Sequence, residues 1–216
     1  MKKESWKNFW KKFWFVVWKD DSFKGCLISV LFLFVVIKFI FFPILNLTTG
    51  TELPLAIVES CSMYHDGNVF SNYDSWWQRH ETKYSSLNLT QNSFSDFSFK
   101  NGFGKGDILF IIKAKPDKIK VGDVIIFNAV GYKVPIIHRV INIKNENGTY
   151  YFSTEGDNNW GQISGVEEKV SQNQIVGKAV VRAAPFIGWM KLIFYEKSSS
   201  NPGSCHEFNE DNTYFK

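Results

Sequence analysis

The sequence predicts a mainly β fold, in which an N-terminal amphipathic segment comes first, then one transmembrane helix, then the β domain. Three observations predict it. Residues 26–45 form an apolar run of membrane-spanning length, the excess positive charge lies before that run, and short β-branched strands bounded by Gly, Asp and Asn follow from residue 105 onward. The 216 residues are enough for one domain with a core plus such appendages.

The first 25 residues hold the charge excess. They contain seven lysines and three acidic residues, whereas the rest of the chain is neutral overall. A basic segment beside an apolar one points to a membrane surface and not to nucleic acid as the partner. Trp6, Phe9, Trp10, Phe13 and Val17 share one helical face. We expect an interfacial helix over residues 6–18, with a short helix that packs on a partner subunit as the alternative.

The apolar run at 26–45 reads "CLISVLFLFVVIKFIFFPIL". At ~1.5 Å per residue it spans about 30 Å, the thickness of a hydrocarbon core. Lys38 costs about 2.5–3.5 kcal/mol on insertion scales, which the surrounding apolar residues outweigh. A buried core helix and a cleaved signal peptide are the alternatives; the latter needs a shorter core and a small-x-small cleavage site. The first basic residue after the run is Arg79, so the N-terminus is expected in the cytosol and residues 46–216 on the other side.

Beyond the membrane, residues 52–63 look extended, and residues 64–103 form an insert rich in Asn, Ser and aromatic residues without clear periodicity. We expect Trp76, Trp77 and the phenylalanines of this insert either to enter the bilayer surface or to form a separate flap. Strands are expected at 106–114, 121–129, 134–144, 148–157 and 174–184. The predicted organisation is an interfacial segment 1–25, a membrane helix 26–45, a β domain 46–195 and a polar tail 196–216.

Candidate chemistry centres on a serine and a histidine. The stretch "ESCSMYHD" places Ser60 and Ser62 on either side of Cys61, and His138 lies within an otherwise apolar strand. A serine needs a base to remove its proton, and histidine is the usual one because its pKa of about 6.5 lies near neutral pH. Asp157 ends the strand after the histidine strand and can orient the imidazole if the two strands pair. Taken singly, a strand histidine is more often a core residue, and the aspartate is better explained as a turn residue.

The three cysteines are Cys26, Cys61 and Cys205, and their spacing fits neither a zinc site nor a CxxC redox pair. No metal and no cofactor are expected. A pairing of Cys61 with Cys205 stays open. A thiol protease that uses Cys61 is disfavoured, because alternation along an extended strand sends Cys61 and Ser62 to opposite sides.

The motifs "SCSM", "GDVIIF", "IIHRV", "TEGDNN" and "IVGK", in this order after a membrane anchor, resemble the signal peptidase I family of the archaeal and endoplasmic-reticulum type. The resemblance implies a signal-peptidase-like β catalytic domain that removes signal peptides from exported preproteins. It assigns Ser62 as the nucleophile, His138 as the general base and Asp157 as the acid. Ser60 resembles the oxyanion-hole contributor of the bacterial branch.

The chain departs from the family in three places. His65 stands where the family usually has proline, the acid that often follows the Gly-Asp-Asn-Asn motif is missing at its usual place, and the insert at 64–103 is long. Glu167 and Glu168 are therefore alternatives to Asp157. These departures also leave a second interpretation, in which the chain is a catalytically inactive, membrane-anchored binding or assembly subunit.

The expected partners are preprotein signal peptides, the lipid bilayer and, as an open option, other membrane subunits. The expected location is the cell membrane or the endoplasmic reticulum membrane, with a single membrane pass. Three Asn-x-Ser/Thr sequons, at Asn46, Asn88 and Asn147, permit glycosylation in a suitable host.

Overall fold

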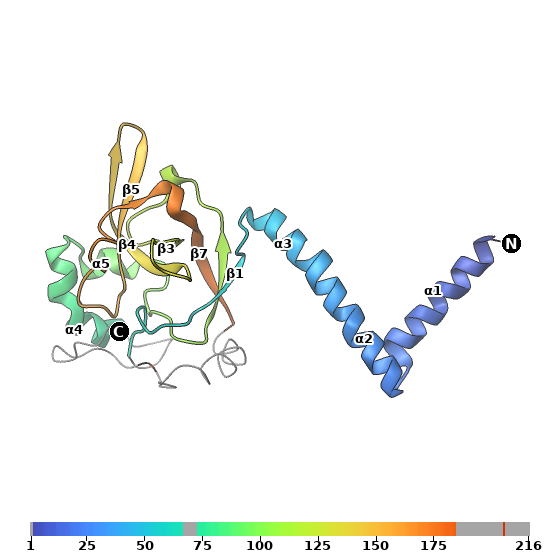
Figure 1. Cartoon of the computed structure of the whole chain (residues 1–216). Coiled ribbons are helices and arrows are strands. Elements are labelled where there is room, and N and C mark those ends of the chain that lie inside the picture. The colour runs from blue at the N-terminus through green and yellow to red at the C-terminus, as the bar shows by residue number, and fades with distance from the viewer. Residues whose placement is uncertain (1, 67–72, 185–204, 206–216) are drawn as a thin grey trace. The chain divides into compact units, whose positions relative to one another are not determined.

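The computed structural model describes residues 2–66, 73–184 and 205 (Figure 1). The chain divides into two compact units, residues 1–48 and residues 49–216. Most of the expected tail at 196–216 and part of the insert lie outside the described residues.

The first unit is helical. Helix α1 spans Lys2–Lys19, and a second helical run comprises α2 (Phe23–Val36), a π-helical turn (Ile37–Phe41) and α3 (Phe42–Thr49). Ser22 caps α2 by accepting a hydrogen bond from the Gly25 amide. Pro43 lacks the N–H that would bond the carbonyl one turn earlier, and the π-helical turn falls in that same stretch. The run Phe23–Thr49 is long and apolar enough to cross a membrane.

Helix α1 is the amphipathic segment that the sequence predicts. Its aromatic rings stack along the helix, as in the Trp6–Phe9 and Trp14–Trp18 pairs, and most of them are exposed. Near its C-terminal end the Val17 carbonyl accepts a hydrogen bond from the Ser29 hydroxyl of α2. One amphipathic helix and one apolar helix therefore precede the β domain, which confirms this part of the predicted fold class.

The second unit is built on one curled antiparallel sheet. Within the described residues the strand order is β1-β2-β7-β3-β4-β5-β6. The bounds are Leu55–Ile57 (β1), Ile108–Ile112 (β2), Val124–Phe127 (β3), Ile136–Glu146 (β4), Thr149–Glu155 (β5), Val170–Ser171 (β6) and Ile175–Ala184 (β7). Register shifts between β2 and β7, β3 and β7, and β4 and β5 mark irregularities that bend the sheet. The mainly β fold is confirmed.

Strand β3 lies at the centre of the core. All four of its residues are buried, because alternate side chains enter two different apolar clusters. Val124 and Ile126 pack in one cluster, and Ile125 and Phe127 pack in the other. The apolar run without polar alternation, which the sequence shows at 121–129, is thus the signature of a strand buried on both faces.

The repeated Gly-Asp sequence before β2 and β3 forms two similar turns. Gly106 and Gly122 have positive φ angles of 88° and 92°, which favour glycine. The carboxylates that follow accept backbone N–H bonds: Asp107 from Gly104, and Asp123 from Lys120. These Asp side chains therefore have local turn roles.

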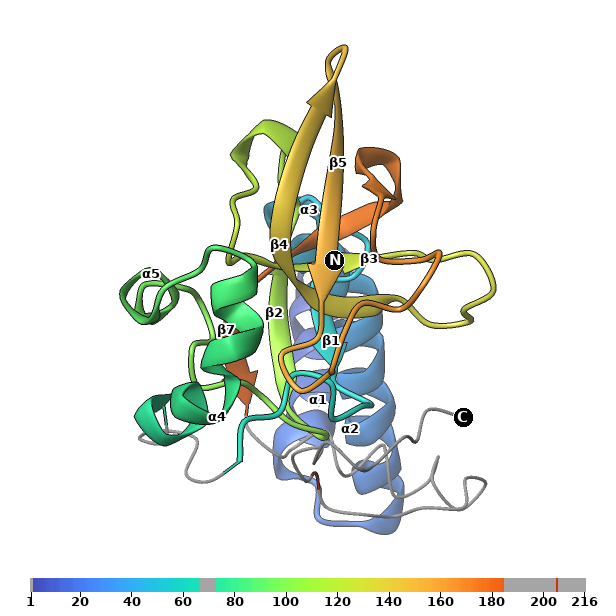
Figure 2. The same cartoon turned by 90° about the vertical axis from the view of Figure 1, so that its left-hand side faces the viewer.

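In its described part the insert is helical and packed, which corrects the expectation that its aromatic residues enter the bilayer surface or form a separate flap. It contains α4 (Tyr73–Ser86) and α5 (Gln91–Ser95), which lie together beside the sheet (Figures 1 and 2). Trp76, Trp77 and Phe94 are fully or almost fully buried, so these rings form a small core and are not available to lipid. The residues at 73, 76, 77, 80 and 84 do have helical spacing, although every one of them is aromatic or histidine.

Candidate active site

Ser62 lies in the turn that follows β1. The Val58 amide still pairs with the Asp107 carbonyl, after which the chain leaves the sheet and the Tyr64 amide bonds to the Cys61 carbonyl. The Ser62 hydroxyl is 3.1 Å from the Ser60 hydroxyl. The Cys61 sulfur is joined to Cys205 by a disulfide, which is the pairing that the sequence left open, so Cys61 is not a free thiol.

His138 is buried in the first half of β4, and its ring is held by Glu167. The His138 Nδ1 atom is 2.5 Å from Glu167 Oε1. The same Glu167 oxygen accepts the Thr154 hydroxyl at 2.9 Å, and Oε2 accepts the Ile163 amide at 2.8 Å. The carboxylate is fully buried and its orientation is fixed from three sides. Such a contact leaves the His138 Nε2 atom free to act as a proton acceptor.

Ser60, Ser62 and His138 line one cavity of about 460 Å³. Its other walls are mainly apolar. Leu55 and Ile57 of β1 and Ile136 of β4 form part of them, and Ile163 contributes from the segment between β5 and β6. Ser62 is hydrogen-bonded to Ser60 and not to His138 within the described residues. Catalytic hydrogen bonds are often loose before substrate binds, so this arrangement is compatible with a nucleophile and its base.

Asp157 occupies a different network from the one the sequence suggests. Its two carboxylate oxygens accept from the Arg139 Nε and Nη2 atoms at 2.8 and 2.6 Å. They also contact the His65 Nε2 atom and the Tyr84 hydroxyl, each at 3.0 Å. Because alternation along β4 sends His138 and Arg139 to opposite faces, the aspartate that binds Arg139 is turned away from His138. The contact expected of Asp157 is made by Glu167.

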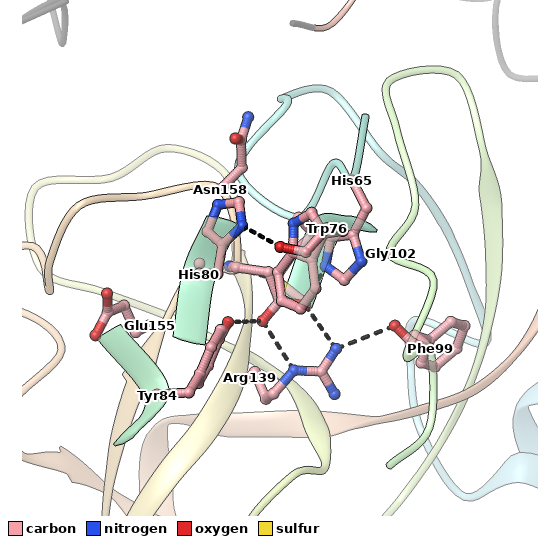
Figure 3. Close-up of polar contacts among 12 residues, drawn as sticks. His65, Trp76, His80, Tyr84, Phe99, Gly102, Arg139, Glu155 and Asn158 are labelled. Atoms are coloured by element: carbon pink, nitrogen blue, oxygen red, sulfur yellow. Dashed lines mark hydrogen bonds and ion pairs between the residues drawn. The ribbon is translucent and has the colours of Figure 1, made fainter. Parts of the chain in front are cut away.

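Figure 3 shows this network, with the Tyr84 hydroxyl and the Arg139 guanidinium on one side and His65 above Trp76 on the other. Burial alone would raise the pKa of Asp157, but the Arg139 guanidinium and the His65 hydrogen bond together hold that pKa well below its ordinary value. Burial lowers the pKa of His65 to about 4 although Asp157 accepts its hydrogen bond. The pair therefore consists of a neutral imidazole and a charged carboxylate near neutral pH.

His65, which stands where the family that the motifs resemble usually has proline, connects the serine turn to α4. Its ring stacks on Trp76 with centroids 3.6 Å apart, and its other side approaches Gly102 so closely that a Cβ there would lie 2.6 Å from the ring. Gly102 also has a positive φ of 65°. The departure at position 65 is thus part of how the long insert is attached.

The "GDNN" segment supports the backbone of the serine turn. The Asn158 amide donates to the Ser62 carbonyl at 2.8 Å, and the Asn158 side chain donates to the Cys61 carbonyl at 3.0 Å. A Cβ on Gly156 would lie 2.7 Å from the same Ser62 carbonyl, so only glycine fits at this approach. Sequence reasoning treated the motif as a source of the acid and missed this supporting role.

Comparison with known proteins gives a consistent result. No protein-family model matches the chain. The signal peptidase complex catalytic subunits SEC11C of Homo sapiens and Mus musculus are 36% identical to it over 101 residues, which are 44% of this chain and 52% of each relative. The chain is similar to signal peptidase catalytic subunits.

The SEC11 subunit of Candida tropicalis is 28% identical over 138 residues, which cover 59% of this chain and 78% of that relative. The chain spans about half the length of the mammalian SEC11C proteins that it matches. The similarity to SEC11 subunits confirms the resemblance to signal peptidase I of the endoplasmic-reticulum type that the sequence motifs indicated.

Proposed function

We propose that this chain is a membrane-anchored serine endopeptidase that removes signal peptides from exported preproteins. In this proposal Ser62 is the nucleophile, His138 the general base and Glu167 the acid that orients it. Asp157 does not serve as the orienting acid and instead holds Arg139, His65 and Tyr84 together.

The observation that carries the proposal is the environment of His138. Its Nδ1 atom faces a buried carboxylate while its side chain lines the same cavity as Ser62. A carboxylate on Nδ1 favours the tautomer with a proton there and stabilises the imidazolium that forms when Nε2 takes the serine proton. A histidine that serves only to fill a core has no need to share a cavity with a serine hydroxyl.

The proposed reaction follows from these positions. The Ser62 oxygen attacks the scissile carbonyl carbon as its proton moves to His138 Nε2, and the carbonyl oxygen becomes an oxyanion. The Ser60 hydroxyl and the Ser62 backbone N–H stabilise that oxyanion. The C–N bond then breaks, and His138 returns the proton to the leaving amine. Water, deprotonated by His138, hydrolyses the acyl ester and regenerates the Ser62 hydroxyl.

The cavity suits a peptide in extended conformation. Strand β1 is an edge strand of the sheet and forms one wall of the cavity, so a peptide can lie along it with main-chain hydrogen bonds. The apolar walls accept small apolar side chains near the cleaved bond. The apolar helix Phe23–Thr49 would hold the enzyme at the membrane, where signal peptides emerge, and so raise the effective concentration of substrate.

We further propose a single membrane pass in the endoplasmic reticulum membrane, with the N-terminus in the cytosol and the β domain in the lumen. The lysines before the apolar helix support this orientation. The relatives are named as subunits of a signal peptidase complex, which supports other membrane subunits as partners.

The direct test is cleavage of a preprotein by purified protein, alone and with its membrane partners, in detergent. We expect Ser62→Ala to lower the cleavage rate at least about a thousandfold. Ser95→Ala is the matched control, because among the described residues that hydroxyl bonds only to the Asn92 carbonyl in α5. Full cleavage by the Ser62→Ala protein would refute the assignment. If the chain is instead an inactive binding or assembly subunit, the wild-type protein and Ser62→Ala should cleave the preprotein equally, both alone and with the membrane partners.

A further inference from the structure

Lys83 is a nearly buried cation outside the proposed catalytic group. It lies in the last turn of α4, and its side chain is 12% exposed. Its ammonium donates to the carbonyl oxygens of Gly156, Asp157 and Asn159 at 2.9, 3.2 and 2.6 Å. It also pairs with the Glu155 carboxylate at 2.9 Å.

The segment 156–159 therefore makes contacts on two sides, one toward Lys83 and the other toward the serine turn. Its carbonyls converge on Lys83, whereas the Asn158 amide and side chain donate to the carbonyls of Ser62 and Cys61. The Asp157 amide approaches the Met63 sulfur at 3.5 Å. One ammonium thus fixes the peptide groups whose opposite edges support the serine turn. A lysine is suited to this because it is a compact charge with three donors that point in different directions.

The insert supports the histidine strand as well. Arg139, the neighbour of His138, donates to the carbonyls of Ser98 and Phe99 at the end of the insert at 2.8 and 3.1 Å. Its guanidinium lies 4.7 Å from the centre of the Phe94 ring. The insert therefore contacts residues that hold both proposed catalytic side chains, and among its described residues only Phe103 lines the cavity.

We infer that the insert is a brace for the active site and that Lys83 is its positioning residue, which sets the location of Ser62 through residues 156–159. This inference rests on the proposed function for its kinetic consequence, but its structural consequence stands without it. Lys83 touches neither the cavity nor the reacting atoms, so its removal should slow the chemical step and leave substrate binding nearly unchanged.

The experiment compares Lys83→Met, Glu155→Gln and the double variant. Lys83→Met alone leaves the Glu155 carboxylate buried without its cation, so it lowers the melting temperature as well as the rate. Glu155→Gln in the double variant removes that charge penalty but cannot restore the three carbonyl contacts. We expect the double variant to regain most of the melting temperature while kcat stays roughly ten- to a hundredfold low and KM stays within about twofold.

Lys169→Met is the matched control, because Lys169 forms an exposed pair with Glu146 at 2.8 Å away from the cavity. It should change neither kcat nor KM. The inference is overturned if the Lys83→Met/Glu155→Gln protein recovers both the melting temperature and kcat, or if Lys83→Met cleaves as fast as the wild type.

Hydrogen exchange tests the positioning role of Lys83 independently of the proposed peptidase activity. Amide exchange of the peptide that contains Asn158 should become faster in the double variant than in the wild type, because the Asn158 N–H loses its fixed geometry. If this exchange rate is the same in both proteins, the inference that Lys83 and the insert position the serine turn is wrong, even if the protein is a peptidase. Faster exchange in a protein that shows no Ser62-dependent cleavage supports the brace and overturns the proposed function alone.

Discussion

At the residue scale, the buried acids contact different partners, and this difference underlies the proposed chemistry. Glu167 contacts His138, whereas Asp157 contacts Arg139. The two carboxylates lie apart because successive side chains of β4 point to opposite faces. His138 and Arg139 are neighbours in the chain but belong to different networks. One network faces the cavity, and the other faces the insert.

Glu167→Gln tests the role of the acid. The amide keeps the size of the side chain but removes the charge that stabilises the His138 cation, so kcat should fall roughly 10²- to 10⁴-fold with KM little changed. Glu168→Gln is the control, since its exposed carboxylate accepts from the Gly165 amide and was the other candidate that the sequence offered. Steady-state cleavage by the two variants measures this; equal rates would exclude Glu167 as the orienting acid.

His65 makes stability depend on pH. Its pKa is about 4 in the folded protein against 6.5 for the free side chain, so only the unfolded chain takes up this proton between those values. Its contribution is therefore complete above about pH 6.5 and declines as the pH falls toward 4. The lowered pKa of Asp157 adds a further loss only below 3.8, and the raised pKa of Glu155 acts in the opposite direction.

The measurement is urea unfolding of the wild type and of His65→Gln in micelles at pH 7.5 and 4.5. Acidification should cost the wild type about 2–3 kcal/mol more of its free energy of unfolding than it costs the variant. The same loss in both proteins would show that His65 titrates normally.

At the scale of elements, the proposed active site lies where four segments meet. The turn after β1 supplies Ser60 and Ser62, β4 supplies His138, the segment before β6 supplies Glu167, and residues 156–159 hold the serine turn. The two Gly-Asp turns before β2 and β3 position strands of the core and take no direct part.

Gly156→Ala tests the close approach of residues 156–159 to the serine turn. The new Cβ would lie 2.7 Å from the Ser62 carbonyl oxygen and 2.7 Å from the Asn159 side-chain nitrogen, so the turn must shift. We expect a rate loss of roughly tenfold or more and a lower melting temperature. Gly161→Ala is the matched control, because nothing lies within 4 Å of a Cβ there. A Gly156→Ala protein with wild-type rate and melting temperature would contradict the described packing.

Much of this arrangement can be read from local sequence, and some of it cannot. The strands, the apolar helix and the positions of Ser62 and His138 follow from periodicity and motifs. The partner of His138 depends on the path of residues 158–167, which turn back over β5, and no local pattern encodes that path. Helix α4 was missed because its buried face is made of Trp, Tyr and His, and Lys83 because a lone lysine in a polar insert looks solvent-exposed.

At the scale of the whole molecule, a basic amphipathic helix and an apolar helix precede the β domain, which we propose to be lumenal. The hairpin of β4 and β5 projects from the sheet, and its tip carries the sequon Asn147-Gly148-Thr149 (Figure 2). Asn147 and Gly148 have positive φ angles of 52° and 84°, as in a tight two-residue hairpin turn, and both are exposed.

Glycosylation of Asn147 tests the proposed lumenal placement of the β domain. When the full chain is translated with endoplasmic reticulum microsomes, Asn147 should receive a glycan, and Asn147→Gln should remove one mobility step on a gel. Asn142→Gln, an exposed asparagine on the same hairpin without a sequon, should leave the pattern unchanged. If no step depends on Asn147, the lumenal placement of the β domain loses its support.

The central claim is that Ser62 and His138 act as one catalytic unit, and double-mutant kinetics test it most directly. The rate of preprotein cleavage is measured for Ser62→Ala, His138→Ala and the variant that carries both. The account predicts that each single variant loses nearly all activity and that the double variant is no slower than either. Wild-type activity in either single variant, or losses that multiply in the double variant, would contradict it.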